Sequence, residues 1–212
     1  HQVDLVTYPI GADKEVAGLR IFRCLRPFWI RQVKTGPSAN KLVLDFFLFF
    51  SALKRLLLKR YDMIHTHEEA SLFGTLLGGV FRIPHLYDMH SSLVQQMDNF
   101  QFTRSRLVRR LFAINESWAL KRARSVIVIC RSLYEHAAAI TAKDKLTLIE
   151  NFMDETPDQL DPEMLARIRD TLPLKRRIVT YTGTLEHYQG IPLLLDSLDY
   201  LDPRFHLVLV GG

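Results

Sequence analysis

Histidines follow two β-rich runs of the sequence, at the point where each run ends. The stretch "IHTHEEAS" contains His65 and His67, followed by Glu68 at the start of the next helix, and "HLYDMHSS" places His90 at the end of the second run. The two serines after it, Ser91 and Ser92, are candidate helix caps. Because ligands bind at the carboxyl ends of strands in an open α/β sheet, we expect these histidines to share one edge if their strands are neighbours.

Several interpretations fit these histidines. His-x-His with an acidic residue and a distant histidine satisfies the preference of zinc for nitrogen and oxygen ligands, and would make a metallohydrolase. His65 and His67 would point the same way on a strand, although the spacing is loose and no cysteine assists. Alternatively, neutral imidazoles hydrogen-bond sugar hydroxyls, with His90 against the reacting sugar. The remaining interpretation is that backbone groups satisfy the histidines, His65 in particular.

A second candidate site is the turn "VTYTGTLEHYQG" at residues 179–190. It leaves an apolar strand and opens the helix of "IPLLLDSL", where unpaired backbone N–H groups can converge on a phosphate. The turn contains no lysine or arginine. We therefore expect backbone N–H groups and the neutral side chains of Thr184 and Gln189 to contact the phosphate, with His187 adding a positive charge when protonated.

Short β-rich runs alternate with segments long enough for helices, which is typical of parallel βαβ units. The continuous apolar character of two of these runs, "SVIVIC" and "RIVTYT", indicates strands that are covered on both faces. The alternation predicts an α/β fold with an open, doubly wound sheet. The expected strands are residues 3–9, 61–67, 84–90, 125–130, 145–151, 177–183 and 206–212.

Residues 151–175 interrupt this alternation with three prolines and an acidic run. We expect a linker there, with a short helix that starts near Pro162. It would join two Rossmann-like domains, residues 1–150 and 176–212, of which the second is only begun. In that second domain one apolar helix face is expected over residues 191–201. Because the chain starts with a strand and stops just after one, we expect it to be a fragment cut at both ends.

The composition excludes a disordered or fibrous chain, since 48% of the residues are hydrophobic. A net charge of +5 favours anionic partners such as nucleotides, phospholipid headgroups or nucleic acid. Cys24 and Cys130 lie far apart without metal-ligand spacing, which predicts a reducing compartment.

Two segments have unusual helix patterns. Residues 41–60 are the most apolar, but their uncharged run, residues 46–53, is far shorter than the ~20 residues of a membrane span. This helix either packs in the core or lies on a membrane surface. Residues 104–124 carry seven basic side chains and only Glu116 as an acid, which indicates a solvated face or a surface for an anionic partner.

The order of the pieces is informative beyond any one of them. The segments "YDMIHTHEEASLFGTLLGG", "IPHLYDMHSS", "NESWALKRARSVIVICRS", "LTLIENFMD", the glycine turn and "HLVLVGG" follow one another through essentially the whole chain. This series resembles the family 4 glycosyltransferases of the GT-B fold. The resemblance implies two Rossmann-like domains and a transferase of the hexosyltransferase type. It would move a sugar from a nucleotide-diphosphate donor with retention at the anomeric carbon, with no metal and no other cofactor.

The resemblance also implies partners and a location. The acceptor would be a polysaccharide, a glycolipid or a similar molecule at the cytoplasmic side of a membrane. The protein would contact the anionic inner face of the plasma membrane peripherally, and it would bind no nucleic acid.

Site residues are carried over by position. The resemblance implies that His90 is the catalytic histidine beside the donor sugar and the acceptor, while His67 and Glu68 lie on the acceptor-side rim. Asn151 matches the asparagine of the family's "NGvD" element, which Asp154 closes. The expected donor-binding residues are Asn151, Gly183, Thr184, His187, Gln189, Gly190, Gly211 and Gly212.

The chain departs from the family at three of these places. Thr184 stands where many members have arginine, Gln189 where many have lysine, and Phe152 replaces the glycine after the asparagine. The family's first strand and glycine-rich acceptor loop would lie before His1, and its pair of glutamates after Gly212, so this chain alone is expected to be inactive. Two further alternatives stay open, a sugar-nucleotide epimerase of the GT-B fold and a catalytically silent nucleotide-sugar-binding module.

Overall fold

The computed structural model describes residues 2–13, 15–31, 33, 38–99, 105–151, 161–173 and 175–211. The chain divides into two compact units, unit 1 with residues His1–Asn151 and unit 2 with residues Phe152–Gly212. Each unit is described by itself.

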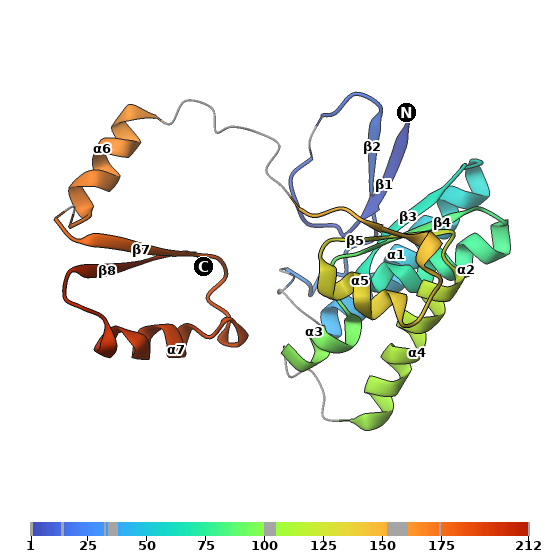
Figure 1. The fold of residues 1–212 in the computed structure, drawn as a ribbon. Helices are drawn as coiled ribbons and strands as arrows, with labels where there is room; N and C mark the ends of the chain where they lie inside the picture. The colour runs from blue at the N-terminus through green and yellow to red at the C-terminus, as the bar shows by residue number, and fades with distance from the viewer. Residues whose placement is uncertain are drawn as a thin grey trace. The chain divides into compact units, whose positions relative to one another are not determined.

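Unit 1 is built on a four-stranded parallel sheet in the order β3-β4-β5-β6. Successive right-handed crossovers that advance in one direction place their helices on the same face of a sheet. The three connecting helices lie along one face in Figure 1, and α2 packs on α4 as this arrangement requires. The strands are β3 (Ile64–His67), β4 (His85–Met89), β5 (Ser125–Val128) and β6 (Leu146–Leu148), and the connecting helices are α2 (Ser71–Phe81), α4 (Arg106–Arg122) and α5 (Arg131–Ala138).

The core of unit 1 lies between this sheet and its helices. Alternate residues of the strands are wholly buried, Tyr87 and Met89 on β4 and Val126 and Val128 on β5, because successive side chains of a strand point to opposite faces. The intervening residues of β5 are half-buried, which agrees with the expectation that this strand is covered on both faces. The shorter elements of unit 1 are η1 (Glu68–Ala70), α3 (Leu93–Asn99) and η2 (Lys143–Lys145).

A separate two-stranded sheet precedes the main one, with β1 (Val3–Thr7) and β2 (Leu19–Arg23) in parallel. The strand β2 was not among the expected strands, because two arginines interrupt its apolar residues. The structure explains one of them: Arg20 lies opposite Asp4 in the register and donates to its carboxylate at 2.8 Å. Both strands pack against α1 (Ala39–Leu58), which occupies most of the expected apolar helix.

Helix α1 is covered on one side only. Leu44 is its one wholly buried residue, whereas Leu42, Phe46, Phe50 and Leu57 are 48–69% exposed. Within the described residues, no helix is both long enough and apolar enough to span a bilayer.

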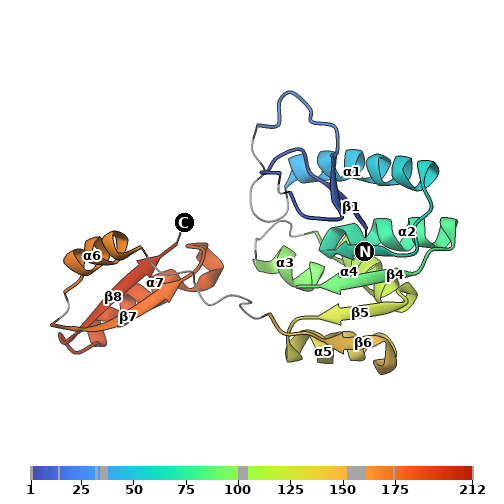
Figure 2. The same cartoon turned by 90° about the horizontal axis from the view of Figure 1, so that it is seen from above.

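Unit 2 contains two parallel strands that pair from Arg177 opposite Phe205 to Thr182 opposite Val210 (Figure 2). The expectation that the first strand is covered on both faces is wrong for the described residues, because only Tyr181 of its six residues is half-buried. The expected helix over residues 191–201 is divided into an α-helix and a 3-10 turn. The elements are α6 (Pro162–Thr171), β7 (Arg177–Thr182), η3 (His187–Gln189), α7 (Ile191–Asp196), η4 (Ser197–Tyr200) and β8 (Phe205–Val210).

Candidate functional site

The expected histidine edge is present in unit 1. Strands β3 and β4 are parallel neighbours, so His65, His67 and His90 meet at the carboxyl end of the sheet. The register places His67 opposite Asp88. Since side chains two apart in a strand share a face, the pair H-x-H on β3 lies beside the pair D-x-H at the end of β4.

Asp88 is the centre of this cluster. His65 Nε2 and His67 Nδ1 lie 3.3 Å and 3.6 Å from Asp88 Oδ2, and His90 Nε2 lies 3.1 Å from Oδ1. The His65 and His67 rings stack with centroids 5.1 Å apart. The imidazoles are 38–58% exposed, but the Asp88 side chain is only 12% exposed. A buried carboxylate therefore lies beneath three accessible imidazoles.

The two oxygens of Asp88 differ in their hydrogen bonding. His65 makes a hydrogen bond with Oδ2, so a carboxylate and not the backbone satisfies its ring nitrogen. Oδ1 has no hydrogen bond among the described residues, since His90 is close enough for an ion pair but lies outside hydrogen-bonding angles. Sequence reasoning did not single out Asp88. The signal was the D-x-H pattern, which has the same spacing of two as H-x-H.

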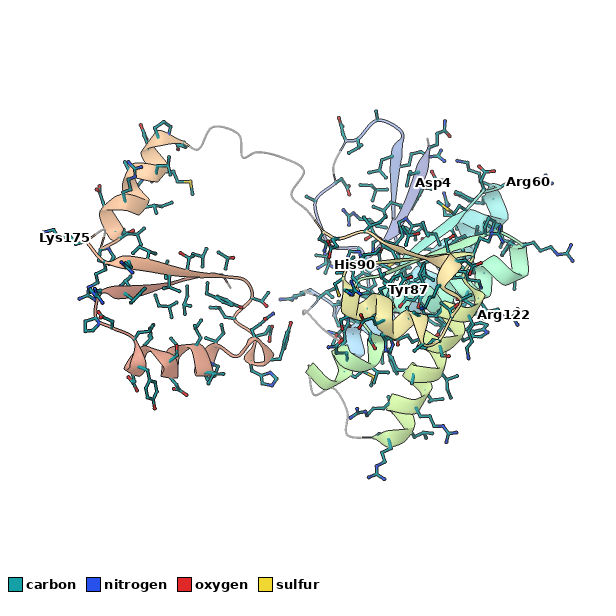
Figure 3. The ribbon with its side chains drawn as sticks, in the orientation of Figure 1. Asp4, Arg60, Tyr87, His90, Arg122 and Lys175 are labelled. Atoms are coloured by element: carbon teal, nitrogen blue, oxygen red, sulfur yellow. The ribbon has the colours of Figure 1, made fainter. Side chains whose placement is uncertain are left out.

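Burial lowers the pKa of His67, and Asp88 opposes this shift while the neighbouring His65 and His90 add to it. This shift favours the neutral form of the His67 imidazole. Tyr87 on β4 is wholly buried, whereas His90, just after the same strand, is partly exposed; Figure 3 labels both side chains.

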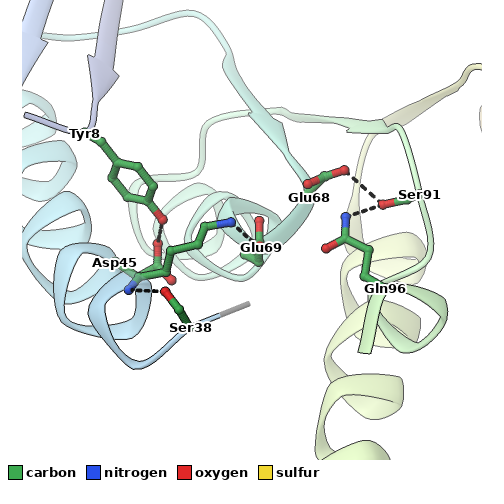
Figure 4. A network of polar contacts seen from close by, with 8 residues as sticks. Tyr8, Ser38, Asp45, Glu68, Glu69, Ser91 and Gln96 are labelled. Atoms are coloured by element: carbon green, nitrogen blue, oxygen red, sulfur yellow. Dashed lines mark hydrogen bonds and ion pairs between the residues drawn. The ribbon is translucent and has the colours of Figure 1, made fainter. Parts of the chain in front are cut away.

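Glu68, expected on the acceptor-side rim, has an unusual backbone. Its φ of 41° lies in the left-handed region, which is strained for a residue with a Cβ atom. Its carboxylate accepts a hydrogen bond from Ser91 Oγ at 2.9 Å, and Ser91 in turn accepts one from the Gln96 amide (Figure 4). Ser91 is therefore used as a bridge to Glu68 rather than as a cap. Ser92 alone acts as the expected cap, accepting from the Gln95 N–H at 3.5 Å.

A second polar chain joins α1 to the same region. Tyr8 donates to Asp45, and Lys41 pairs with Glu69 at 3.1 Å (Figure 4). Burial raises the pKa of Asp45, and its proximity to Glu69 contributes to the same effect.

Glu116 fixes the chain just after His90. Its side chain is 3% exposed, its Oε2 accepts from the Leu93 N–H at 2.6 Å, and its Oε1 lies 2.7 Å from His136 Nε2. Leu93 is the first residue of α3 and lies three positions after His90. The one acid of residues 104–124 thus faces inward, although the sequence indicated only a basic surface.

Asn151, the expected donor ligand of unit 1, follows β6 at the carboxyl edge of the same sheet and is exposed. Three other expected site positions, Phe152, Asp154 and Gly212, lie outside the described residues.

The glycine turn of unit 2 depends on a close approach of two chain segments. Gly183 has a φ of +154°, and its N–H donates to the Val210 carbonyl at 3.1 Å. A Cβ atom on Gly211 would lie 1.7 Å from the Gly183 carbonyl oxygen. The structure therefore brings together Gly183 and Gly211 at the adjacent ends of β7 and β8.

The polar residues of this turn contact one another. Gln189 Nε2 donates to Thr184 Oγ1 at 3.5 Å, and Tyr181 Oη donates to the Thr184 carbonyl at 2.8 Å. Gly190 has a left-handed φ of 75° and precedes α7, and its carbonyl accepts from the Leu194 N–H. His187 opens η3 two residues before Gln189. Thr184 and Gln189, which stand where many family members have arginine and lysine, thus lie side by side.

Solved structures that resemble this chain include glycosyltransferases of the GT-B fold. The sucrose-phosphate synthase of Thermosynechococcus elongatus is 22% identical with a TM-score of 0.68, and 100% of this chain covers 52% of it. HepE of Anabaena, solved with UDP and glucose, is 18% identical with a TM-score of 0.61, and 91% of this chain covers 47% of it. These likenesses confirm the predicted α/β fold of the GT-B type, and this chain spans about half the length of each structure.

Comparison with curated proteins finds no match. A family model, Glycosyltransferase Family 4, matches residues 1–156 of the 212. This match covers the cluster around Asp88 and confirms the resemblance predicted from the order of the sequence segments, so the chain belongs to glycosyltransferase family 4.

Proposed function

We propose that this chain serves the transfer of a sugar from a nucleotide-diphosphate donor to a polysaccharide, glycolipid or similar acceptor, with retention at the anomeric carbon. One observation carries this proposal: His67 at the end of β3, His90 after β4 and Asn151 after β6 all lie at the carboxyl edge of one parallel sheet, in a chain of glycosyltransferase family 4. This edge is where open α/β sheets bind ligands. The solved complex of HepE with UDP and glucose supports the same class of donor.

In this proposal His90 is the catalytic histidine. Its Nε2 lies 3.1 Å from Asp88, which orients the ring, and its 38% exposure leaves the ring accessible to a sugar hydroxyl. His67 and Glu68 line the acceptor side, where the hydrogen bond from Ser91 fixes the Glu68 carboxylate. The transfer requires no bound metal.

The turn of unit 2 holds the departing diphosphate. Its negative charge develops as the sugar leaves, so donors aimed at it contribute most to catalysis. Thr184 and Gln189 supply neutral hydrogen bonds, which are weaker than those from charged donors. We therefore infer weak diphosphate binding that depends mainly on backbone N–H groups around Gly183 and Gly211.

The experiment is to restore a cation at the turn. Gln189→Lys should tighten binding of nucleoside diphosphates about tenfold, as expected for a neutral hydrogen bond replaced by a charged one. Tyr200→Lys is the matched control, because it adds the same charge at a residue that is 91% exposed on η4. Calorimetry with UDP, GDP and ADP measures the affinity. Equal affinity changes in the two variants would contradict a diphosphate site at the turn.

Because this chain alone is expected to be inactive, transfer itself is tested in a full-length protein that contains it, with labelled nucleotide-sugars and membrane glycans, using NMR to read the anomeric configuration of the product. The expected result is a retained configuration, resistance to EDTA and at least a 100-fold loss of rate in His90→Ala with donor affinity unchanged. Donor binding without any transfer would instead identify a silent nucleotide-sugar-binding module, and change of the donor without an acceptor would identify an epimerase.

We also propose peripheral contact with an anionic membrane, at the cytoplasmic face of the plasma membrane. Leu42, Phe46, Phe50 and Leu57 are exposed and fall within one stripe of α1, and Lys54 lies beside them. Phe46→Asp should weaken binding to phosphatidylglycerol vesicles about tenfold or more, because burying a phenylalanine contributes roughly 2 kcal/mol. Val80→Asp on α2, 75% exposed, is the control. Equal loss in both variants would contradict a membrane role for α1.

A further inference from the structure

The cluster around Asp88 has a geometry that sugar transfer does not require. His65 Nε2, His67 Nδ1 and a carboxylate oxygen of Asp88 all lie within 4.8 Å of one another. Two of these side chains come from β3 and the third from β4, which pair in register. We propose that His65, His67 and Asp88 form a binding site for a divalent transition-metal ion, with zinc as the ion that its ligands fit.

The distances match a tetrahedral ion. Zinc–nitrogen and zinc–oxygen bonds of about 2.0–2.1 Å place neighbouring ligand atoms roughly 3.3–3.4 Å apart in a tetrahedron. Asp88 Oδ2 lies 3.3 Å from His65 Nε2 and 3.6 Å from His67 Nδ1. The two nitrogens lie within 4.8 Å of each other, and their partly exposed rings have room to rotate toward a shared ion.

Burial of Asp88 supplies the second reason. A buried carboxylate is costly unless its charge is paired, and the three imidazoles around Asp88 carry a positive charge only when they are protonated. A divalent cation on Oδ2 would compensate its charge. His90 lies 3.1 Å from the other oxygen, Oδ1, and helps to hold the carboxylate in place. Such outer partners orient metal ligands.

The donor set selects the ion. Two imidazole nitrogens and one carboxylate suit zinc and other late transition metals, whereas magnesium and calcium prefer oxygen ligands. Three protein ligands leave the fourth position open to solvent. An ion held by His65, His67 and Asp88 would lie close to His90. It would therefore compete with a sugar at His90 and inhibit transfer. This consequence rests on the proposed function, but the binding of the ion does not.

The test uses the metal-free chain without donor or acceptor. Titration with Co²⁺ should produce the visible absorption bands of a tetrahedral site, and Zn²⁺ should bind with a stoichiometry of one and displace Co²⁺. His67→Ala and Asp88→Asn should each weaken Zn²⁺ binding at least tenfold, since the first removes a ligand and the second replaces an anionic ligand with a neutral amide. Circular dichroism confirms that Asp88→Asn folds, and the 58% exposure of His67 makes the other variant safe for folding.

His206→Ala is the control, because His206 lies on β8 in unit 2. Its Zn²⁺ affinity should equal that of the unsubstituted chain. Binding weaker than millimolar, or binding that His67→Ala and Asp88→Asn leave unchanged, would overturn the metal site. Neither result concerns donor binding at the turn, so failure of the metal site is distinguishable from failure of the proposed transfer.

Discussion

The geometry of the histidine edge in unit 1 and that of the glycine turn in unit 2 are determined by different interactions. At the histidine edge, buried polar side chains determine the geometry: Asp88 lies beneath three imidazoles, and Glu116 holds the start of α3. At the turn, Gly183 and Gly211 meet through their backbones and the described residues are mostly exposed. The stability of the histidine edge should therefore depend on charge and pH, and that of the glycine turn on whether a Cβ atom is added to its glycines.

The largest effect is expected for Gly211→Ala. A Cβ atom there would lie 1.7 Å from the Gly183 carbonyl oxygen, a backbone atom that cannot rotate away. The ends of β7 and β8 must separate, and we expect a loss of at least about 4 kcal/mol from the stability of unit 2. Hydrogen exchange of the β7 and β8 amides measures this loss, while exchange in unit 1 should stay unchanged.

Gly190→Ala is the matched comparison in the same turn. Space is open around its Cβ position, but its φ of +75° is unfavourable for alanine, so the expected cost is only about 1–2 kcal/mol. Equal exchange rates in the Gly211 and Gly190 variants would contradict the close approach as the determinant of the turn.

Glu116→Ala tests the side-chain mechanism at the edge. The substitution leaves the buried Leu93 N–H and the partly exposed His136 ring without their acceptor. Removing one partner of a buried charged pair costs about 3–5 kcal/mol, and we expect the lower half of this range because the His136 side chain is 43% exposed. Urea unfolding measures the change. Glu116→Gln, which keeps an acceptor for Leu93, should cost less than half as much, and equal losses would refute the hydrogen bond to Leu93.

The fold was predictable where one pattern decided it. Alternating apolar runs and helices predicted that β3 to β6 are parallel strands, and a Pro at the start of a helix predicted α6. The strand β2 was missed because Arg20 pairs with Asp4 across the sheet, and a single sequence does not reveal a cross-strand pair.

The site was predictable only in part. The spacing of His65 and His67 indicated a common face, and the order of segments indicated the family. Asp88 was missed because its role depends on the register of β3 against β4, which a one-residue shift would abolish. Glu116 was missed because a lone acid among arginines reads as a surface residue, whereas its acceptor role depends on where α3 begins.

A pH effect should separate the two regions further. His85, on β4, is buried, and burial lowers its pKa to about 4, with a smaller contribution from His65. Below pH 6.5 the unfolded chain binds a proton that the folded chain does not, so the stability of unit 1 should fall as the pH decreases from 6.5 to 4. The full loss is about 3 kcal/mol.

Urea unfolding at several pH values measures this dependence. His85→Gln removes the titrating group and should flatten the curve between pH 6.5 and pH 4, although its stability at pH 7 is lower. An unchanged slope in this variant would show that another group determines the acid sensitivity of unit 1.

The smallest effects come from two glycines of α2 that differ only in what faces them. A Cβ atom on Gly74 would lie 2.3 Å from His85 Nε2 and 2.7 Å from Thr66 Cγ2, so Gly74→Ala must displace the buried hydrogen bond between His85 and Thr66. Overpacking of this kind costs about 1–3 kcal/mol. Gly79 has nothing within 4 Å of its Cβ position, so Gly79→Ala should instead gain up to about 1 kcal/mol from helix propensity.

Thermal unfolding of unit 1 measures the stability of both variants. Both glycines lie in the same helix and gain the same helix propensity, so the close contacts at Gly74 should make the two stability changes opposite in sign. Unfolding at several pH values adds a second measurement, the acid sensitivity of unit 1, which a change in helix propensity would not alter. If Gly74→Ala opens the packing around His85 to water, the pKa of His85 should rise toward its ordinary value of about 6.5. The acid sensitivity should then shrink in this variant and stay full in Gly79→Ala. Equal acid sensitivity in both would mean that the His85 environment does not depend on the close contact with α2.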